Sequence, residues 1–570
     1  MENKYIIKLI KSTAKLMELF GENDFKIKSY NSAVFNLEKT EKRLADLSLD
    51  QLEEIEGVGK SIAKIIDEIN RTQSLGYYEE MLSKTPAGIL EMMKLSGFGP
   101  KKIKLIWEQL KIETLEDLIT ACEANKVAAL KGFGDKTQEK LKESASFLIQ
   151  NRYYLHYREA EKLGKILVED IQGLSDNIKV SLTGEVRRKM EVIKPVELLV
   201  ATTEVAKLRD YLRDAEELEF LEKQSGPRNL KAIHLSSGAE ISIHLCKPEQ
   251  FVNELFRTTA SPLHLSYALE GDQSFTQLLK EKNYDSEEAI YSAAELPFIA
   301  PELREGLWEF DWAKSKKMPE LLEVSELKGI LHNHSTYSDG AHSLEAMAQY
   351  CKELGYEYLG ISDHSKTAAY ANGLQESRIK EQHKEIDLLN EKMGDFRIFK
   401  GIESDILGDG SLDYSDDVLA SFDFIVASIH SQLNMDEKTA TNRLIKAIAN
   451  PFTTILGHPT GRLLLQRQAY PINHKAVIDA CAEYGVVIEI NAHPYRLDLD
   501  WRHVHYALEK GVMISVNPDA HEKAGYHDMY FGVCVGRKAG LTAEQTFNAL
   551  SRSEIEKYFE KRKQQALSKA

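Results

Sequence analysis

The chain has 570 residues, 43% hydrophobic and 28% charged, a globular composition that predicts three to five domains at about 100–200 residues each. The net charge of −16 argues against a protein that coats nucleic acid over its whole surface. Residues 1–150, with 23 Lys and Arg against 24 Asp and Glu, are nearly neutral, so we expect any DNA contact there. No apolar run approaches the ~20 residues of a membrane span, and MENKYIIKLIKS lacks a signal-peptide pattern, so we expect a cytoplasmic protein without membrane contact.

Residues 1–150 show helical periodicity and one short pattern that recurs three times. In each copy an apolar helix end is followed by a Gly-x-Gly turn and then by a new helix, in IEGVGKSIAKII, LSGFGPKKIKLI and LKGFGDKTQEKL. The glycines of the turns are Gly57, Gly59, Gly97, Gly99, Gly132 and Gly134, and the lysines just beyond them are Lys60, Lys101, Lys102 and Lys136.

Two glycines permit a tight turn with positive φ, which leaves the backbone N–H groups of the next helix free to meet an anion. A plain helix–turn–helix corner is the alternative for any one copy. Three copies with nearby lysines favour binding to the phosphate backbone of DNA, without reading of the base sequence. The turns resemble helix-hairpin-helix motifs.

Residues 151–315 change character, because strand-like stretches at Ile178–Leu182, Glu197–Thr202 and Glu240–Leu245 mix with helices, which predicts an α+β region. A charged linker follows over residues 316–327. The five cysteines have no CxxC spacing, so neither a disulfide framework nor a thiolate metal site is expected; they are Cys122, Cys246, Cys351, Cys481 and Cys534.

From residue 328 onward, seven apolar strand candidates alternate with helical segments, which predicts a parallel barrel related to the (β/α)8 type. Histidines and carboxylates follow the strand candidates, on the face where such barrels carry their chemistry. Nine such residues suffice for two or three divalent ions in a site that hydrolyses phosphate esters. The predicted ligands are His332, His334, Asp339, His364, Glu403, His430, His458, Asp519 and His521.

Roles within this site follow from the chemistry of the side chains. Glu403 and Asp339 are candidate bridges between ions, and Asp363 could orient an imidazole. Arg462 could bind a substrate phosphate or form a salt bridge, and Arg496 and Asp498 are open in the same way. Five further histidines are expected to be ordinary, namely His342, His383, His474, His503 and His505.

Over residues 326–570, the motifs LHNHSTYSDG, SDHS, GIESDI, SIHS, GHPTGR and NPDAH resemble those of the PHP (polymerase and histidinol phosphatase) family. The resemblance implies a distorted (β/α)7 barrel with a trinuclear centre of Mn²⁺, Zn²⁺ or mixed ions, with Fe²⁺ or Mg²⁺ as further candidates. Upstream, FKIKSYNSA, the glycine turns, GEVRRKMEVIKPVELLVA and LPFIAPELREG resemble bacterial family X DNA polymerases.

The polymerase half departs from that family where its chemistry lies. The family's three metal-binding aspartates align with Pro195, Glu197 and Ser242, and its Gly-Ser turn for triphosphate reads Gly184-Glu185. A single carboxylate cannot hold the two ions of phosphoryl transfer, so we expect polymerase activity to be lost. The Schiff-base lysine of relatives with lyase activity aligns with Ile65, so lyase activity is not expected either.

We therefore expect a DNA-directed phosphodiesterase of DNA repair, acting as a metal-dependent 3′–5′ exonuclease on gapped or 3′-ended DNA. Cleavage at abasic sites or 3′-end processing is a further expectation. An active family X polymerase and a histidinol-phosphatase-like enzyme are the alternatives. The expected domains are an 8-kDa-like helical domain (1–82), helix-hairpin-helix fingers (83–150), a degenerate nucleotidyltransferase-like palm and thumb (151–315), the linker (316–327) and the PHP domain (328–570).

Overall fold

The computed structural model describes residues 3–38, 40, 42–95, 97–270 and 273–568. The chain forms two compact units. The first comprises residues 1–152 with 465–467, and the second comprises residues 153–464 with 468–570. No described helix is long and apolar enough to cross a membrane.

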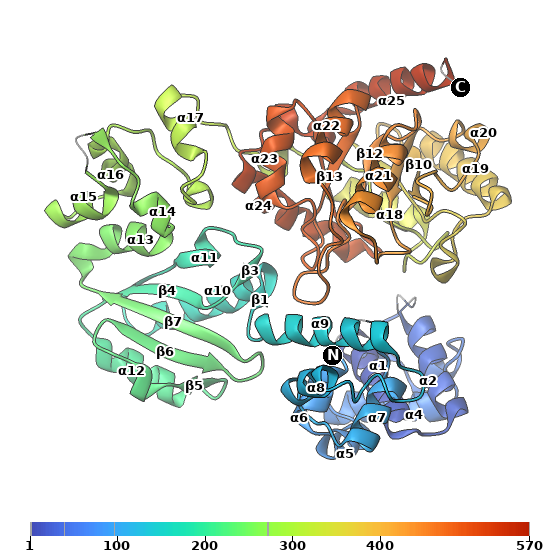
Figure 1. Cartoon of the computed structure of the whole chain (residues 1–570), viewed down its shortest axis with the longest axis horizontal. Coiled ribbons are helices and arrows are strands. Elements are labelled where there is room, and N and C mark those ends of the chain that lie inside the picture. The colour runs from blue at the N-terminus through green and yellow to red at the C-terminus, as the bar shows by residue number, and fades with distance from the viewer. Residues whose placement is uncertain (1–2, 39, 41, 96, 271–272, 569–570) are drawn as a thin grey trace. The chain divides into compact units, whose positions relative to one another are not determined.

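The first unit is built from helices, as the periodicity of its sequence predicts. Helix α4 illustrates the cause, since Ile62, Ile66 and Ile69 recur on one face and are buried in a shared apolar core. The helices of this unit, blue to cyan in Figure 1, are α1 (Asn3–Phe20), α2 (Asp24–Leu37), α3 (Leu49–Glu53), α4 (Lys60–Thr72), α5 (Gly76–Ser83), α6 (Ala87–Met92), α7 (Pro100–Leu110), α8 (Leu115–Glu123) and α9 (Asp135–Gln150).

The second unit begins with a five-stranded sheet of order β2-β4-β7-β6-β5, in which β4 and β7 are parallel and the other pairs antiparallel. Figure 1 shows β4, β7 and β6 side by side. The strands of this sheet are β2 (Lys179–Leu182), β4 (Val196–Ala201), β5 (Leu218–Phe220), β6 (Asn229–His234) and β7 (Ala239–Cys246), while β1 (Leu155–His156) and β3 (Val192–Ile193) form a separate two-stranded sheet. The helices are α10 (Tyr157–Gly173), α11 (Gly184–Arg187), α12 (Val205–Asp214), α13 (Phe251–Thr259), α14 (Pro262–Leu265), α15 (Phe275–Glu281), α16 (Glu287–Ala293) and α17 (Glu309–Ser315).

The rest of the unit is a sheet of seven parallel strands in the order of the chain, from β8 to β14. The strands are β8 (Gly329–Ile330), β9 (Tyr358–Ile361), β10 (Arg397–Asp405), β11 (Phe424–Ser428), β12 (Ile455–Leu456), β13 (Val487–Asn491) and β14 (Ile514–Asn517). The two edges approach each other beyond β8 and β14, where Asn333 pairs with Ala520 and the N–H of His334 donates to the Ala520 carbonyl at 2.8 Å. The sheet is therefore a nearly closed parallel barrel, and the predicted fold class is confirmed.

Helices follow the strands around this barrel, in yellow to red in Figure 1. They are α18 (Leu344–Glu353), α19 (Glu376–Lys392), α20 (Asp416–Leu419), α21 (Glu437–Ile448), α22 (His474–Tyr484), α23 (Trp501–Glu509), α24 (Met529–Ala539) and α25 (Arg552–Leu567). The helical segments expected between the strand candidates are therefore present, as α21 and α22 illustrate.

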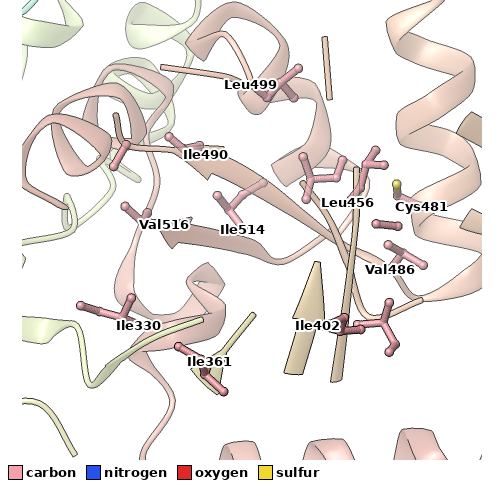
Figure 2. Packing of buried hydrophobic residues seen from close by; sticks show 14 of the residues in the cluster. Ile330, Ile361, Ile402, Leu456, Cys481, Val486, Ile490, Leu499, Ile514 and Val516 are labelled. Atoms are coloured by element: carbon pink, nitrogen blue, oxygen red, sulfur yellow. The ribbon is translucent and has the colours of Figure 1, made fainter. Parts of the chain in front are cut away.

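Side chains alternate between the two faces of each barrel strand, because successive residues of a strand point to opposite sides. Figure 2 shows residues of the apolar cluster shared by the strands and the helices, among them Ile330, Ile402 and Ile490. A separate cluster inside the barrel contains Phe399 and Phe424, both at most 2% exposed.

This second cluster fills the barrel from below with aromatic rings, in which Phe559 stacks on Phe424 with ring centroids 5.2 Å apart. A Cβ atom on Gly401 would lie 2.2 Å from the Phe424 ring, so only glycine fits beside it. The interior above this floor is left to polar side chains, which include Glu403 and Glu489.

Candidate functional site

All nine predicted ligands lie at the carboxyl ends of the barrel strands. His332, His334 and Asp339 follow β8, His364 follows β9 and Glu403 lies on β10. His430 follows β11, His458 follows β12, and Asp519 and His521 follow β14. Their donor atoms form four groups, each with all atoms within 4.8 Å of one another: His334, Asp339, His364 and His521; His332, Glu403 and His458; His332, His334 and Asp519; and His364, Glu403 and His430.

Glu403 lies at the centre of this cluster and is 1% exposed. Its Oε1 atom is 2.9 Å from Nε2 of His458 and 3.2 Å from Nε2 of both His332 and His430. Its Oε2 atom is 2.9 Å from Nδ1 of His364. A carboxylate that contacts imidazoles on several sides has the geometry of a bridge between ions.

The remaining acids extend the cluster towards its entrance. Asp519 Oδ1 lies 3.0 Å from Nε2 of His334. Asp339 Oδ1 lies 3.4 Å from Nε2 of His521 and 3.7 Å from Nε2 of His364, and its side chain is 35% exposed. Asp339 is therefore the acid of the cluster that solvent reaches most easily.

The charges of the cluster shift the pKa values of its members in opposite directions. Burial alone would lower the pKa of His430, but Glu403 and Asp405 raise it to about 10. Burial would raise the pKa of Glu403, yet the surrounding imidazoles, His430 first, hold it well below its ordinary value. Burial first, and then the neighbouring His521 and His364, lower the pKa of His334 to about 3. The carboxylates are thus held ionised, as metal binding requires.

Two observations test whether these residues fit divalent ions. Nε2 of His332, Nδ1 of His364 and Oε2 of Glu403 are buried and lie close to other donor atoms of the cluster, but they form no hydrogen bond among the described residues. Buried polar atoms without a hydrogen bond are rare and are typical of metal ligands whose ion is absent. His458 and Asp519 have φ values of +22° and +51°, in the region that non-glycine residues rarely adopt and that concentrates at functional sites. The nitrogen and oxygen donors fit Mn²⁺ or Zn²⁺.

Partners of the imidazoles were not identified from the sequence. Nδ1 of His332 lies 2.7 Å from Oε2 of Glu489, and Nδ1 of His430 is hydrogen-bonded to Asp405. Such partners fix the orientation of a metal-binding imidazole. The sequence pattern could have indicated both carboxylates. Asp405 follows Glu403 by two positions and so lies on the same face of the strand, and Glu489 is the only acid in the apolar strand VIEIN.

Asp363 does not contact an imidazole through a hydrogen bond that the structure records. Its carboxylate accepts hydrogen bonds from the N–H of Ser335 at 2.8 Å, the hydroxyl of Ser335 at 2.7 Å and the side chain of Gln382 at 2.6 Å. It therefore fixes the loop that carries His334 and Asp339, instead of orienting a ring.

The two arginines that the sequence left open have different surroundings. Arg462 forms an ion pair with Asp500 and donates to the carbonyl oxygens of Arg496 and Leu497, so the salt-bridge alternative describes its contacts. Arg496 is the arginine at the cluster, with its Nε atom 3.7 Å from Oδ2 of Asp519. Asp498 is buried and accepts a hydrogen bond from the N–H of Thr460 at 2.9 Å.

Of the histidines expected to be ordinary, none belongs to a potential metal group within the described part of the chain. His474 and His503 stack on each other with centroids 3.6 Å apart, and His505 stacks on Trp308 at 4.0 Å. These rings pack against neighbours away from the ligand cluster.

The three glycine turns of the first unit share one backbone geometry. Gly57, Gly97 and Gly132 have φ values of +78°, +80° and +87°. The second glycines, Gly59, Gly99 and Gly134, are the N-caps of α4, α7 and α9, and no side chain caps these helices. A Cβ atom on any of these N-cap glycines would meet no atom within 4 Å, so each helix N-terminus is open to an anion.

The lysines beside the turns differ in their freedom. Lys60 and Lys136 are exposed. Lys101 forms an exposed ion pair with Asp24 at 3.4 Å, and Lys102 lies over the rings of Phe98 and Phe133 at 5.4 and 5.8 Å. Exposed pairs of this kind are weak, so Lys101 can exchange its partner for a phosphate.

The aligned polymerase positions lie together in the sheet of the second unit. Glu197 on β4 is paired in register with Ser242 on β7. Glu197 Oε1 lies 2.9 Å from Nε2 of His244, and the Ser242 hydroxyl bonds to Asn229 at 3.0 Å. Pro195 precedes the strand and offers no ligand atom, and none of the potential metal groups among the described residues lies in this sheet.

The turn at Gly184 is occupied by protein groups. Burial raises the pKa of Glu185, whose carboxylate accepts a hydrogen bond from the N–H of Lys194 at 3.2 Å. The guanidinium of Arg188, a residue 9% exposed, bonds to Glu305 at 3.0 Å and to the carbonyl of Thr259 at 2.7 Å. The turn therefore carries a half-buried acid, and the guanidinium of the nearby Arg188 is already paired.

Family models match three parts of the chain. Residues 1–75 match a helix-hairpin-helix domain, residues 89–146 match a SAM-like helix-hairpin-helix tandem, and residues 331–493 match a PHP domain. The PHP match ends before Asp519 and His521, which the fold brings to the cluster.

Curated relatives extend the likeness over the whole chain. The DNA polymerase/3′-5′ exonuclease PolX of Bacillus subtilis (strain 168) is 34% identical over 98% of this chain and 100% of its own length. A probable phosphatase of Thermoanaerobacter sp. (strain X514) is 26% identical over 42% of this chain and 97% of its own length. A probable phosphatase of Acetivibrio thermocellus is 28% identical over 33% of this chain and 78% of its own length.

Proposed function

The chain belongs to the family of the DNA polymerase/3′-5′ exonuclease PolX, and on that premise we propose that it is a metal-dependent 3′–5′ exonuclease of DNA repair. The observation that carries the proposal is the contact of Glu403 with four imidazoles inside the barrel. The same chain also has three open helix-hairpin-helix turns. Cleavage at abasic sites and processing of blocked 3′ ends belong to the same proposal, as does a cytoplasmic location.

The nine clustered residues would hold two or three ions of Mn²⁺ or Zn²⁺, with Glu403 and Asp339 as bridging carboxylates. Ions bound there would supply Lewis-acid chemistry and make water a competent nucleophile at neutral pH. Glu489 and Asp405 orient the rings of His332 and His430 for this role. Arg496, at the edge of the cluster, is the cation that would hold a phosphate oxygen of the substrate.

The helix-hairpin-helix turns would bind the DNA. Three helix N-termini capped only by glycine offer backbone N–H groups to phosphates, and the lysines beside them add positive charge. A histidinol phosphatase has no use for such turns.

We further propose domain boundaries at residues 82, 150, 315 and 327.

The polymerase half would serve as a DNA handle without polymerase activity. Its one surviving carboxylate, Glu197, is bonded to His244, and Ser242 is bonded to Asn229. An acid at Glu185 stands where a triphosphate would need donors, which disfavours nucleotide binding by electrostatic repulsion. The alternative is an active polymerase, which an assay of nucleotide incorporation on gapped DNA would detect.

The decisive experiment is Mn²⁺-supported degradation of single strands labelled at the 3′ or 5′ end, with wild type compared with His332→Ala/His334→Ala. We expect stepwise loss from the 3′ end that disappears in the variant. Histidinol phosphate should be tested alongside, because the similarity to probable phosphatases favours a small-molecule phosphatase as the second candidate. Rapid monoester turnover without DNA cleavage would establish that candidate and refute the nuclease.

A further inference from the structure

One aromatic side chain beside the ligand cluster has no role in the proposed reaction. Tyr370 is 73% exposed, the second most exposed large hydrophobic side chain among the described residues. It lies in the loop between β9 and α19, six residues after His364, and the centroids of the two rings are 6.1 Å apart. An exposed aromatic ring directly beside the ligand cluster offers a flat ligand a surface on which to stack.

Tyr370 lies within electrostatic range of the acids of the cluster. Its pKa is raised above the ordinary value, first by desolvation and then by Asp405, Glu403 and Asp339. The ring therefore lies beside His364 at the ligand cluster and is open to solvent. Arg496, with its Nε atom 3.7 Å from Oδ2 of Asp519, lies at the same cluster.

The loop that carries Tyr370 is held firmly by its neighbours. Ala368 and Ala371 on either side are at most 2% exposed, and the N–H of Leu374 bonds to the His364 carbonyl at 2.8 Å. The N–H of Thr367 bonds to Asp413 at 2.7 Å. The backbone that carries the ring is thus anchored on both sides, so binding a ligand would order the side chain of Tyr370 and not the loop.

We propose that Tyr370 forms a nucleobase-binding subsite, on which an unpaired base at the 3′ end of the strand stacks while the adjoining phosphodiester enters the ligand cluster. This deepens the proposed nuclease function and rests on it. Aromatic rings accept any base because every base has a π face, which suits a nuclease that degrades a strand regardless of sequence. A base that is still paired in a duplex cannot stack on the ring, so the subsite selects single-stranded or frayed ends.

The test compares KM and kcat for two oligonucleotides, one ordinary and one whose last two residues are abasic. For the ordinary strand we expect Tyr370→Ala to raise KM roughly 5- to 150-fold with a smaller change in kcat, the range that loss of one stacking contact implies. Tyr370→Phe and Tyr370→Trp should restore KM. For the abasic strand, wild type and Tyr370→Ala should have the same KM.

A matched control is Tyr484→Ala, since Tyr484 is also exposed but ends α22, at the opposite end of the strands. Its KM values should equal those of wild type. If Tyr370→Ala raised KM equally for the ordinary and the abasic oligonucleotide, the ring would only shape the loop and the subsite would be refuted. An unchanged KM for the ordinary oligonucleotide would refute it as well. If wild type degrades neither strand, the nuclease proposal itself fails, which is a separate outcome.

Discussion

The Nδ1 atom of His332, just after β8, lies 2.7 Å from a carboxylate oxygen of Glu489 on β13, and both side chains are fully buried. The contact turns the other nitrogen of the ring towards Glu403, 3.2 Å away. Glu489 therefore sets the direction in which His332 can bind an ion.

Replacing this carboxylate should weaken metal binding without removing a ligand. For Glu489→Gln we expect the apparent affinity for Mn²⁺, measured from activity against metal concentration, to fall roughly 10- to 100-fold, the usual effect of losing such a partner. Glu483→Gln on the exposed surface of α22 is the control and should behave as wild type. An unchanged Mn²⁺ affinity in Glu489→Gln would contradict this role.

Metal ions should also stabilise the folded barrel, because the unfolded chain has no preformed cluster. At a free Mn²⁺ concentration 100 times Kd, one site adds about 2.7 kcal/mol to the free energy of unfolding. Melting temperature should therefore rise with Mn²⁺ and fall back with a chelator. His332→Ala/His334→Ala should show a much smaller rise, and an equal rise in that variant would place the stabilising ions elsewhere.

Substitution of Arg496 should mainly lower activity, whereas substitution of Arg462 should mainly lower stability. Arg496→Ala should lower kcat/KM at least tenfold and leave melting nearly unchanged, because one charged hydrogen bond to phosphate is lost. Arg462→Ala should lower stability by about 1–3 kcal/mol, since it removes the partly buried ion pair with Asp500 and the hydrogen bonds to two backbone carbonyl oxygens. Circular dichroism melts and exonuclease kinetics on both variants check the contrast, and a reversal of the two effects would restore Arg462 as the phosphate ligand.

Restoring the three aspartates should fail to restore polymerisation. We expect Pro195→Asp/Glu197→Asp/Ser242→Asp to extend no primer on gapped DNA, because Glu185 stays at the turn and Arg188 remains bound to Glu305. Retained exonuclease activity in the same preparation shows that the variant is folded. Template-dependent extension by this variant would refute our account of the turn.

Loss of two turn lysines should change the salt dependence of DNA binding. For Lys60→Ala/Lys136→Ala, the slope of log affinity against log salt should become shallower by about 1.8 on duplex DNA, at ~0.9 per phosphate contact. Fluorescence anisotropy between low and moderate salt measures the slope. Lys15→Ala, which removes an exposed lysine of α1 that belongs to none of the three turns, should leave the slope unchanged.

Much of the site could be predicted because the ligands and the strand pattern occupy the same short segments. A histidine that follows an apolar run, such as His458 after β12, marks its own place on the rim of a parallel barrel. The partners could not be predicted in the same way. Glu489 reaches His332 across 157 positions of chain, and only the closure of the barrel brings them together. The same holds for Arg462 and Arg496, which the sequence could not distinguish.

The aromatic floor of the barrel, with Phe399 and Phe424 beneath the ligand cluster, makes the reaction chamber a dead end. A strand that enters the barrel mouth cannot pass through and out of the other side. The mouth must therefore admit a strand terminus or the tip of a sharp bend, and each released product must leave by the way it came. Release of the cleaved nucleotide therefore competes with advance of the shortened strand. This competition favours a distributive enzyme, which removes one nucleotide each time it binds a strand.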